Sequence, residues 1–261
     1  MMLLTFIIPV RHQDNAKDWP LLVSNLKQTV SSISNQTNDD YSIIIVANHG
    51  AVLPEFNEKV AIVRVDFSPN LVHDKGSASE AEFLDAFRLD KGRRVLEAMK
   101  SSKESSYFMI VDDDDLVSKD IVNFVSTNKG VCGWVIDKGF LWNSGGNFLL
   151  KHNALNNVCG TTLIIKSELY RIDEDFDEYS EVTIKDMLGS HKRIVDILKS
   201  KGHKLEKLPF RGAIYRVAHS GSHSQNGGIF DYINPRHPKL FLKNISKLRF
   251  KTDSINSDFF G

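Results

Sequence analysis

Short apolar runs separated by helix-like stretches fill the first half of the chain. Isoleucine, valine and phenylalanine dominate four runs that predict strands, at residues 3–10, 41–47, 60–66 and 107–111. Most of these runs are continuous in apolar residues rather than alternating, which is typical of strands buried on both faces of a parallel sheet. We therefore expect an α/β fold with a mostly parallel central sheet and helices on both faces.

Helical periodicity appears between these runs. Apolar residues from Leu22 to Ile33 share one helical face, and Pro20 just before them suits a first helical turn. A second helix is predicted over residues 93–100, opened by residues 90–92. These two helices would lie between consecutive strands and cover the sheet.

The second half of the chain changes character. Residues 137–160 are rich in Asn and Gly, which indicates loops or short strands around a site. A helix is predicted over residues 183–201, ended by Gly202. Further strands are predicted at 161–165, 203–208 and 213–218.

The chain ends in a basic amphipathic segment. Lysines recur every fourth residue from Lys239 to Lys251, opposite an apolar face that includes Phe241, so one helix is predicted over 238–251. Such a helix suits peripheral contact with the inner face of an anionic membrane. The alternative is a helix docked on the domain with a solvated lysine edge.

Composition narrows the class of protein. The chain has 261 residues and 41% hydrophobic content, enough for a full core, and its 33 basic and 33 acidic residues give no net charge that would indicate nucleic-acid binding. Two cysteines fit a reducing compartment better than a disulfide scaffold. Residues 1–10 lack the features of a signal peptide, and no run approaches the ~20 apolar residues of a membrane span. We expect a soluble, cytoplasmic protein.

Four consecutive aspartates, Asp112–Asp115, follow the apolar run that ends at Val111. Like charges ~4 Å apart repel by about 4 kcal/mol at an effective dielectric of 20, so water or a cation must offset the repulsion. Mg²⁺ uses one or two carboxylates and fills its other positions with water and phosphates. Because ligands of α/β sheets bind beyond the carboxyl ends of strands, we predict a metal–diphosphate site. The alternative is a solvated acidic turn before the next helix.

Five phrases carry a family resemblance: Phe6–Arg11, Leu26–Gln36, Ile43–Val46, Met109–Asp115 and Phe176–Glu178. In order and spacing they resemble the GT-A nucleotide-sugar glycosyltransferases, especially those of the family 2 type. The resemblance covers most of residues 3–224. It implies a GT-A fold and a metal-dependent transfer of sugar from a nucleotide-diphosphate donor to a glycan or lipid-linked acceptor.

The resemblance also implies a division of the chain. A single catalytic domain would cover residues 1–235, with a nucleotide-binding half at about 1–117 and an acceptor half at about 118–235. Residues 236–261 would form the basic C-terminal tail.

Metal ligands follow from the same resemblance. Asp112 and Asp114 match the family's Asp-x-Asp motif, which holds Mn²⁺ or Mg²⁺. Several GT-A enzymes add a late histidine to this set, and His219 matches its place, with His223 as the next candidate. An imidazole ligand shifts the preference toward Mn²⁺. Asp115 would ligate the ion or orient the loop.

Nucleotide contacts are expected at the ends of the strands and beside the predicted helix start. Backbone N–H groups and basic side chains at a helix start suit a diphosphate. Asparagine stands at position 48, where the family commonly has an acidic residue that contacts the base. The expected contacts are Pro9, Arg11, Asn48, Asp66, Lys91, Gly92, Arg93, Asp112 and Asp113.

The identity of the catalytic base is open, because the family's acidic pair before its late helix is replaced here by Ser190 and His191. His191 and Asp186 are the candidates, with Asp177 and Glu181 as further carboxylates. A histidine on an apolar helical face, as His191 is, also suits a structural role.

Two other functions fit the same motifs. A metal-dependent nucleotidyltransferase also places carboxylates beside phosphates, but it normally carries a glycine-rich phosphate loop, and residues 9–20 contain no glycine. A non-catalytic sugar- or nucleotide-binding domain of the same fold is the second alternative. Release of product from a labelled nucleotide sugar would separate them.

Overall fold

The structure is a computed structural model that describes residues 2–73, 76, 78–102, 104–173, 175–218, 228–233 and 238–261, the side chains of 238–240 excepted. The candidate ligands His219 and His223 lie outside the described residues. Within these ranges, no helix combines the length and the apolar content needed to cross a membrane.

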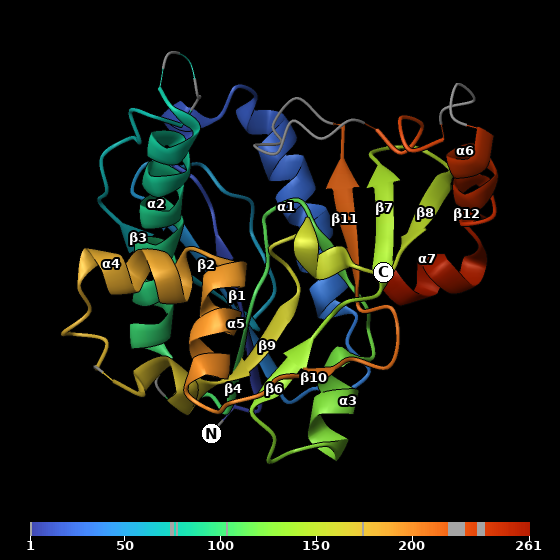
Figure 1. Cartoon of the computed structure of the whole chain (residues 1–261). Helices are drawn as coiled ribbons and strands as arrows, with labels where there is room; N and C mark the ends of the chain where they lie inside the picture. Colours follow the sequence, from blue (N-terminus) through green and yellow to red (C-terminus); the bar gives the residue numbers. More distant parts are fainter. Residues whose placement is uncertain are drawn as a thin grey trace.

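A seven-stranded sheet forms the centre of the molecule, in the order β10-β6-β9-β4-β1-β2-β3 (Figure 1). Pairing is parallel from β4 through β1 and β2 to β3, and between β10 and β6, whereas β9 is antiparallel to β4 and to β6. The mostly parallel central sheet is therefore confirmed. The strands are β1 (Leu4–Pro9), β2 (Tyr41–Asn48), β3 (Val60–Val65), β4 (Tyr107–Ile110), β6 (Gly133–Val135), β9 (Leu163–Lys166) and β10 (Glu206–Lys207).

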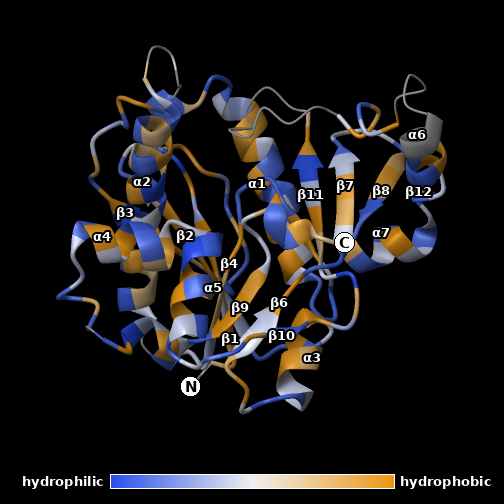
Figure 2. Ribbon diagram, in the orientation of Figure 1, coloured by the Kyte–Doolittle hydropathy of each residue, from blue (hydrophilic) through white to orange (hydrophobic). Residues whose placement is uncertain are grey.

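Helices cover both faces of this sheet. Along β1, Phe6 and Ile8 join the hydrophobic cluster under α1 (Trp19–Ser34) and α3 (Ile121–Thr127), while Ile7 joins the cluster under α2 (Glu80–Ser101) and α5 (His191–Ser200). Figure 2 shows the apolar strands enclosed between more polar outer helix faces. Burial on both faces explains why these strands have continuous rather than alternating apolar sequences.

A second, five-stranded sheet lies beside the first, in the order β12-β8-β7-β11-β5. Only β7 and β8 come from the Asn- and Gly-rich region, whereas β5, β11 and β12 come from other parts of the chain, and Phe259 of α7 (Asp253–Phe259) packs on the sheet. The sequence indicated loops or short strands for residues 137–160 and a strand at 213–218, but it did not predict that these segments pair in one sheet. The strands are β5 (Leu116–Val117), β7 (Gly139–Asn143), β8 (Phe148–His152), β11 (Ala213–Val217) and β12 (Leu248–Phe250).

The helix predicted to open at residues 90–92 opens ten residues earlier, so that prediction is wrong. Ser79 caps α2: its Oγ accepts a hydrogen bond from the backbone N–H of Glu82, and the Glu82 side chain accepts one from the backbone N–H of Ser79. Gly92 therefore lies inside the helix. A Cβ atom there would be 2.7 Å from the backbone oxygen of Ile184, so glycine permits a close helix crossing rather than a helix start.

The single helix predicted over 183–201 is interrupted. A short α4 (Glu181–Thr183) runs into a π-helical turn, η4 (Ile184–Leu188), and α5 begins only at His191. The turn crosses α2 so closely that a Cβ atom on Gly189 would be 2.1 Å from the backbone oxygen of Arg88. The crossing therefore requires glycine where the predicted helix would have continued.

The predicted C-terminal helix is also shorter than expected. Helix α6 (Pro238–Ile245) ends before Leu248, where β12 begins and pairs antiparallel with β8. Lys247 and Lys251 therefore lie outside any helix, and residues 248–250 complete the second sheet.

Candidate active site

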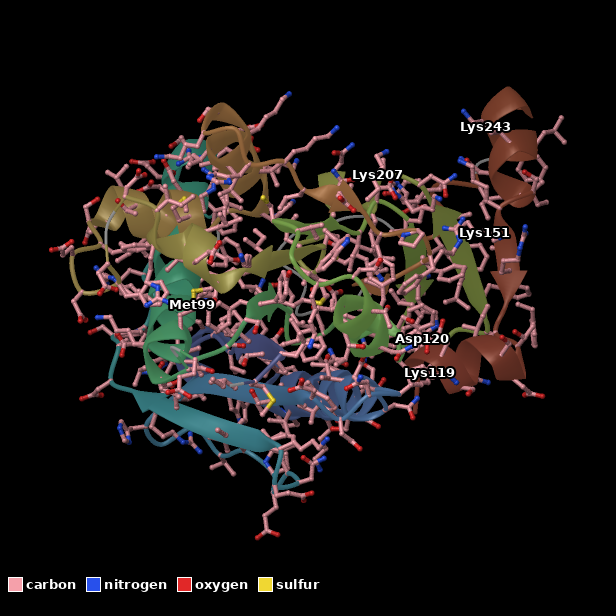
Figure 3. All side chains as sticks on the ribbon, turned by 90° about the horizontal axis from the view of Figure 1, so that it is seen from below. Met99, Lys119, Asp120, Lys151, Lys207 and Lys243 are labelled. Atoms are coloured by element: carbon pink, nitrogen blue, oxygen red, sulfur yellow. The ribbon has the colours of Figure 1, made fainter. Side chains whose placement is uncertain are left out.

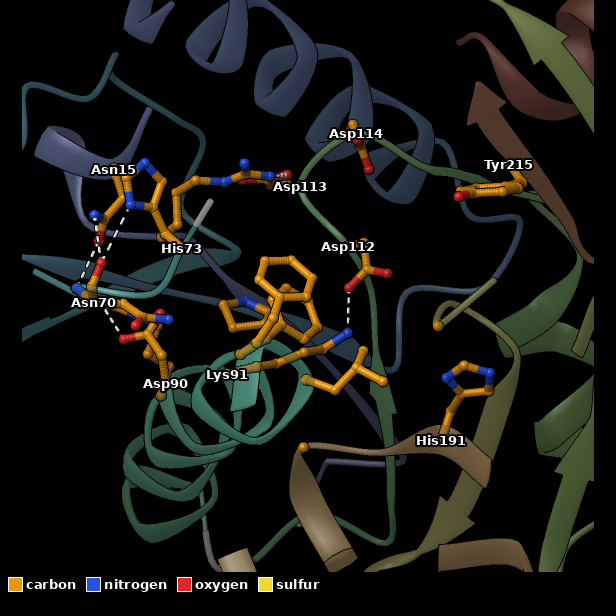
Figure 4. Close-up of a pocket in the computed structure, with 18 of the residues that line it drawn as sticks. Asn15, Asn70, His73, Asp90, Lys91, Asp112, Asp113, Asp114, His191 and Tyr215 are labelled. Carbon is orange, nitrogen blue, oxygen red and sulfur yellow. Dashed lines mark hydrogen bonds and ion pairs between the residues drawn. The ribbon is translucent and has the colours of Figure 1, made fainter. Parts of the chain in front are cut away.

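A cavity of about 270 Å³ lies beyond the carboxyl ends of β1 and β4 (Figure 4). In this view Asn15, Asn70 and His73 lie at one side, His191 and Tyr215 at the other, and Lys91 and Asp112 between them. The predicted site residues that line it are Pro9, Arg11, Lys91, Asp112, Asp113, Asp114 and His191. Those that do not are Asn48, Asp66, Gly92, Arg93 and Asp186.

Lys91, from the middle of α2, forms an ion pair with Asp112. Burial alone would raise the pKa of Asp112, but the charge and hydrogen bond of Lys91 outweigh it and hold that pKa below its ordinary value. A Cβ atom on Gly160 would be 2.6 Å from Oδ2 of Asp112 and 3.0 Å from Nζ of Lys91, so glycine leaves room beside the pair. Both partners are thus charged at the cavity surface.

The next aspartates have different environments. Asp113 lies 4.0 Å from the guanidinium of Arg11. Asp115 is buried and accepts hydrogen bonds from Oγ1 of Thr161 at 2.6 Å and from Sγ of Cys159 at 3.2 Å. Burial, followed by the charges of Asp114 and Asp112, raises the pKa of Asp115 well above its usual range. Asp115 therefore fixes the loop from beneath and faces away from the cavity that the other three line.

Arg216, on β11, supports the acidic loop from the interior. Its backbone N–H donates to Asp115 Oδ1 at 3.2 Å, and its Nε donates to the backbone oxygen of Asp114 at 2.8 Å. The guanidinium also lies over the ring of Trp142, 4.9 Å from its centroid. Further hydrogen bonds from the guanidinium go to Asn25, Gln28 and Ser144. One buried cation thus positions the loop and offsets part of its charge.

Arg94 and Asp90 form the floor of the cavity near Pro9. Arg94 is buried and donates to Asp90 at 3.0 Å and to Oδ1 of Asn48 at 2.8 Å. The Asn48 amide in turn donates to the backbone oxygen of Phe67 at 2.6 Å. Asn48 therefore lies beneath the cavity and holds Arg94. Asp90 was not among the predicted site residues, although its i, i+4 spacing from Arg94 is typical of an ion pair on one face of a helix.

His191 begins α5 and lines the cavity. Its Nε2 atom is buried and has no hydrogen-bond partner among the described residues. Burial, with a further contribution from the charge of Lys91, lowers the pKa of His191 to about 4. The imidazole is therefore neutral near pH 7 and can accept a proton.

This pKa predicts a pH dependence of folding. The pKa of His191 is about 4 in the folded state and 6.5 ordinarily, so the unfolded chain binds more protons between these values. The free energy of unfolding should therefore increase with pH across that range, by roughly 2–3 kcal/mol. Urea unfolding of the wild-type protein and of His191→Gln, measured across the range, checks this prediction.

The matched control is His203→Gln, because His203 lies against Cys132 and does not line the cavity. The control should keep the pH dependence of the wild-type protein, and His191→Gln should lose most of it. Identical profiles for all three proteins would show that His191 is not buried in its neutral form.

The carboxylates proposed as catalytic bases are not at the cavity. Asp186 is paired with Arg193, and Asp177 lies 2.9 Å from Lys100. Glu181 pairs with Arg93 at 2.8 Å on the surface, which also directs Arg93 away from the cavity. Asp66 is exposed at the end of β3. Of the proposed bases, only His191 faces the acidic loop across this cavity.

The donor set suits a divalent ion that binds together with phosphates. Asp112 and Asp114 both line the cavity, and Mg²⁺ or Mn²⁺ commonly takes one or two carboxylates and completes its shell with water and substrate phosphate. Among the residues that the structure describes, no group of three His, Cys, Asp or Glu side chains is placed to hold a metal alone.

No protein-family model and no curated protein sequence matches the chain. Among solved structures, TarS 1–349 of Staphylococcus aureus is similar with a TM-score of 0.50 and 11% identity, over 82% of this chain and 60% of TarS 1–349. The chain thus spans less than two thirds of that structure. The similarity supports the GT-A-like nucleotide-diphospho-sugar transferase fold predicted from the sequence.

Two further structures are more distant. One is the manganese complex of Rv0371C from Mycobacterium tuberculosis, with a TM-score of 0.40 and 10% identity, over 82% of this chain and 90% of Rv0371C. The other is 4-diphosphocytidyl-2C-methyl-D-erythritol synthase from Anaerococcus prevotii, with a TM-score of 0.38 and 8% identity, over 85% of this chain and 91% of the synthase.

Proposed function

We propose that the protein is a glycosyltransferase that moves a sugar from a nucleotide-diphosphate donor to a hydroxyl of a glycan or lipid-linked acceptor. The observation that carries the proposal is the meeting of three groups at one cavity: the carboxylates of Asp112 and Asp114, the cations of Arg11 and Lys91, and the neutral His191. The carboxylates would hold a divalent cation, the basic side chains would bind the diphosphate, and His191 would accept a proton.

The donor diphosphate would lie along the acidic loop. Mn²⁺ or Mg²⁺, held by Asp112 and Asp114, would neutralise the leaving diphosphate. Lys91 and Arg11, which face Asp112 and Asp113 at the same cavity, would also contact phosphate oxygens of the donor. The nucleoside would extend toward Asn15 and Asn70, where Phe83 and Phe87 add an apolar wall for a base.

His191 would act as the general base. The acceptor hydroxyl must lose a proton as it attacks the sugar carbon, and Nε2 of a neutral imidazole can accept that proton. His191 lies at the side of the cavity opposite Asn15 and Asn70, which leaves the space between for the diphosphate and the sugar (Figure 4).

Incubation with a panel of nucleotide sugars and Mn²⁺ tests the proposal. A glycosyltransferase releases a nucleoside diphosphate as the sugar moves to an acceptor or, slowly, to water. A nucleotidyltransferase would instead release inorganic diphosphate from a nucleoside triphosphate. Binding with no release of either product would indicate a non-catalytic binding domain.

Asp114→Ala should weaken binding of the cognate nucleoside diphosphate in the presence of Mn²⁺ by at least about tenfold. Loss of a residue that only hydrogen-bonds a metal ligand typically lowers metal affinity by that much, and Asp114 is proposed as a ligand itself. Titration calorimetry with and without a chelator measures the effect. Asp196→Ala, on the exposed surface of α5, is the matched control and should bind as the wild-type protein does. Equal affinity for all three proteins would contradict the assignment of Asp114.

A further inference from the structure

Four cations gather at one end of the second sheet. Lys151 of β8 donates its backbone N–H to the backbone oxygen of Lys247 at 3.0 Å, which brings those two side chains to neighbouring positions. Arg211 donates to the backbone oxygen of His152 at 3.2 Å, and Arg249 lies on the adjacent β12. Lys151, Lys247, Arg211 and Arg249, together with Lys243 of α6, form the basic end.

The positive potential of the basic end acts on its own members. Burial, followed by the charges of Arg249 and Arg211, lowers the pKa of Lys151. Burial and the charges of Lys247 and Arg211 likewise lower the pKa of His152. Asp137 acts on Arg211 and is itself paired with Lys207 at 2.8 Å. The lowering of the pKa values of Lys151 and His152 by neighbouring cations indicates a positive potential at the basic end.

Large apolar side chains are exposed beside the basic end. On α6, Leu242 is 67% exposed and Ile245, one turn later, is 44% exposed. On the edge of the second sheet, Phe250 is 57% exposed and packs edge-to-face on Phe148, which is 39% exposed. The outward side of α6 therefore carries apolar residues next to Lys243. A helix docked with only a solvated lysine edge would instead turn these residues inward.

An anionic lipid surface fits this arrangement better than a soluble polyanion or a protein. Apolar side chains that border lysines can enter the interface between headgroups and acyl chains while the ammonium groups meet lipid phosphates. A soluble polyanion would gain little from Leu242 and Ile245. Figure 3 shows Lys151 and Lys243 along the same side of the molecule.

We propose that the basic end and the exposed apolar residues of α6 bind the protein peripherally to an anionic bilayer. The basic end lies beside the amino ends of β7 and β11, because Arg211 donates to the backbone oxygen of Gly139 at 2.7 Å and Gly139 lies opposite Ala213. The bilayer would therefore contact this end of the second sheet and the neighbouring α6 (Figure 1).

Sedimentation with vesicles tests this proposal. The full-length protein should sediment with vesicles of phosphatidylcholine mixed with phosphatidylglycerol, should not sediment with pure phosphatidylcholine, and should be released as salt is raised. Changing Lys151, Lys243 and Lys247 together to Gln should weaken binding about a hundredfold, because each basic residue near an anionic membrane contributes about fivefold.

One double variant tests the exposed apolar residues of α6, and two single variants serve as controls. Leu242→Ser with Ile245→Ser should also lose vesicle binding. Val182→Ser on α4 and Lys199→Glu on α5 change equally exposed positions elsewhere and should sediment as the wild-type protein does. Thermal melting of every variant establishes that it is folded.

Unchanged sedimentation of the triple Gln variant or of the double Ser variant would overturn the proposal. Loss with the lysine changes but not with the serine changes would indicate electrostatic adsorption to the bilayer without entry of the apolar residues of α6, which also overturns the proposal. Because these residues do not line the cavity, release of nucleoside diphosphate without vesicles should stay normal in all variants. Failure of membrane binding is thereby distinguished from failure of the proposed transferase activity.

Discussion

Replacing His191 with alanine should lower the rate of sugar transfer by about 10²–10⁴-fold, the usual contribution of a positioned general base, while binding of the nucleoside diphosphate stays nearly unchanged. The physical reason is the separation of roles in the cavity. The acidic loop with Lys91 and Arg11 would contact the diphosphate, whereas His191 lines the side of the cavity left for the acceptor. Steady-state kinetics together with calorimetry measure both quantities.

The pH profile separates a base from a structural histidine. With a pKa of about 4 for His191 in the free enzyme, kcat/KM should increase with pH through about 4 and be level near neutrality. His191→Asp, which restores a carboxylate at this position, should recover part of the lost rate, and His203→Ala should be fully active. A folded His191→Ala protein with the wild-type rate would exclude His191 as the base.

Arg216→Met should destabilise the fold by about 3–5 kcal/mol, because it removes one partner from a buried charge network and leaves the others unpaired. Asp115 would lose the nearby positive charge while the charges of Asp112 and Asp114 remain. The oxygens of Asn25, Gln28 and Ser144 would lose their donor. Urea unfolding at neutral pH measures the change in the free energy of unfolding.

Arg93→Met provides the comparison, since Arg93 forms an exposed pair with Glu181 and pairs of that kind contribute at most about 1 kcal/mol. Adding Asp115→Asn to Arg216→Met should restore part of the stability, because it removes a carboxyl group whose ionisation is opposed by burial and by the charges of Asp114 and Asp112. If Arg216→Met were as stable as Arg93→Met, the acidic loop would not depend on Arg216.

The central sheet could be predicted because its strands are buried on both faces, which produces continuous apolar runs such as Ile43–Val46. The second sheet could not, because its strands are short and their partners are distant in sequence. Strand β7 pairs with β11, so Gly139 lies opposite Ala213. No local pattern specifies such a pairing. The capping box of Ser79 and Glu82 marks the start of α2 in the sequence. The helix was instead predicted to start at residues 90–92 because of the glycine at position 92.

The acidic loop and Arg11 could be placed from sequence because side chains just after parallel strands share one edge of the sheet. Lys91 was selected for a helix start that does not exist, and it reaches Asp112 from the middle of a long helix instead. Asp186 could not be excluded from sequence, since its pairing with Arg193 depends on the interrupted helix at Gly189.

The close crossing of α2 and the π-helical turn limits how this active site can diversify over evolutionary time. At Gly92 and Gly189 even a methyl group would collide with backbone atoms of the other segment, so neither position can drift while its neighbour is retained. Lys91 directly precedes Gly92 and His191 comes two residues after Gly189, so the crossing fixes their separation. Phe83 lies one turn and more before Arg88, the residue of α2 that Gly189 meets, and is not held by this crossing. Divergent descendants of such a protein would acquire new donor preferences there first, and a selection library for altered donors is best built there.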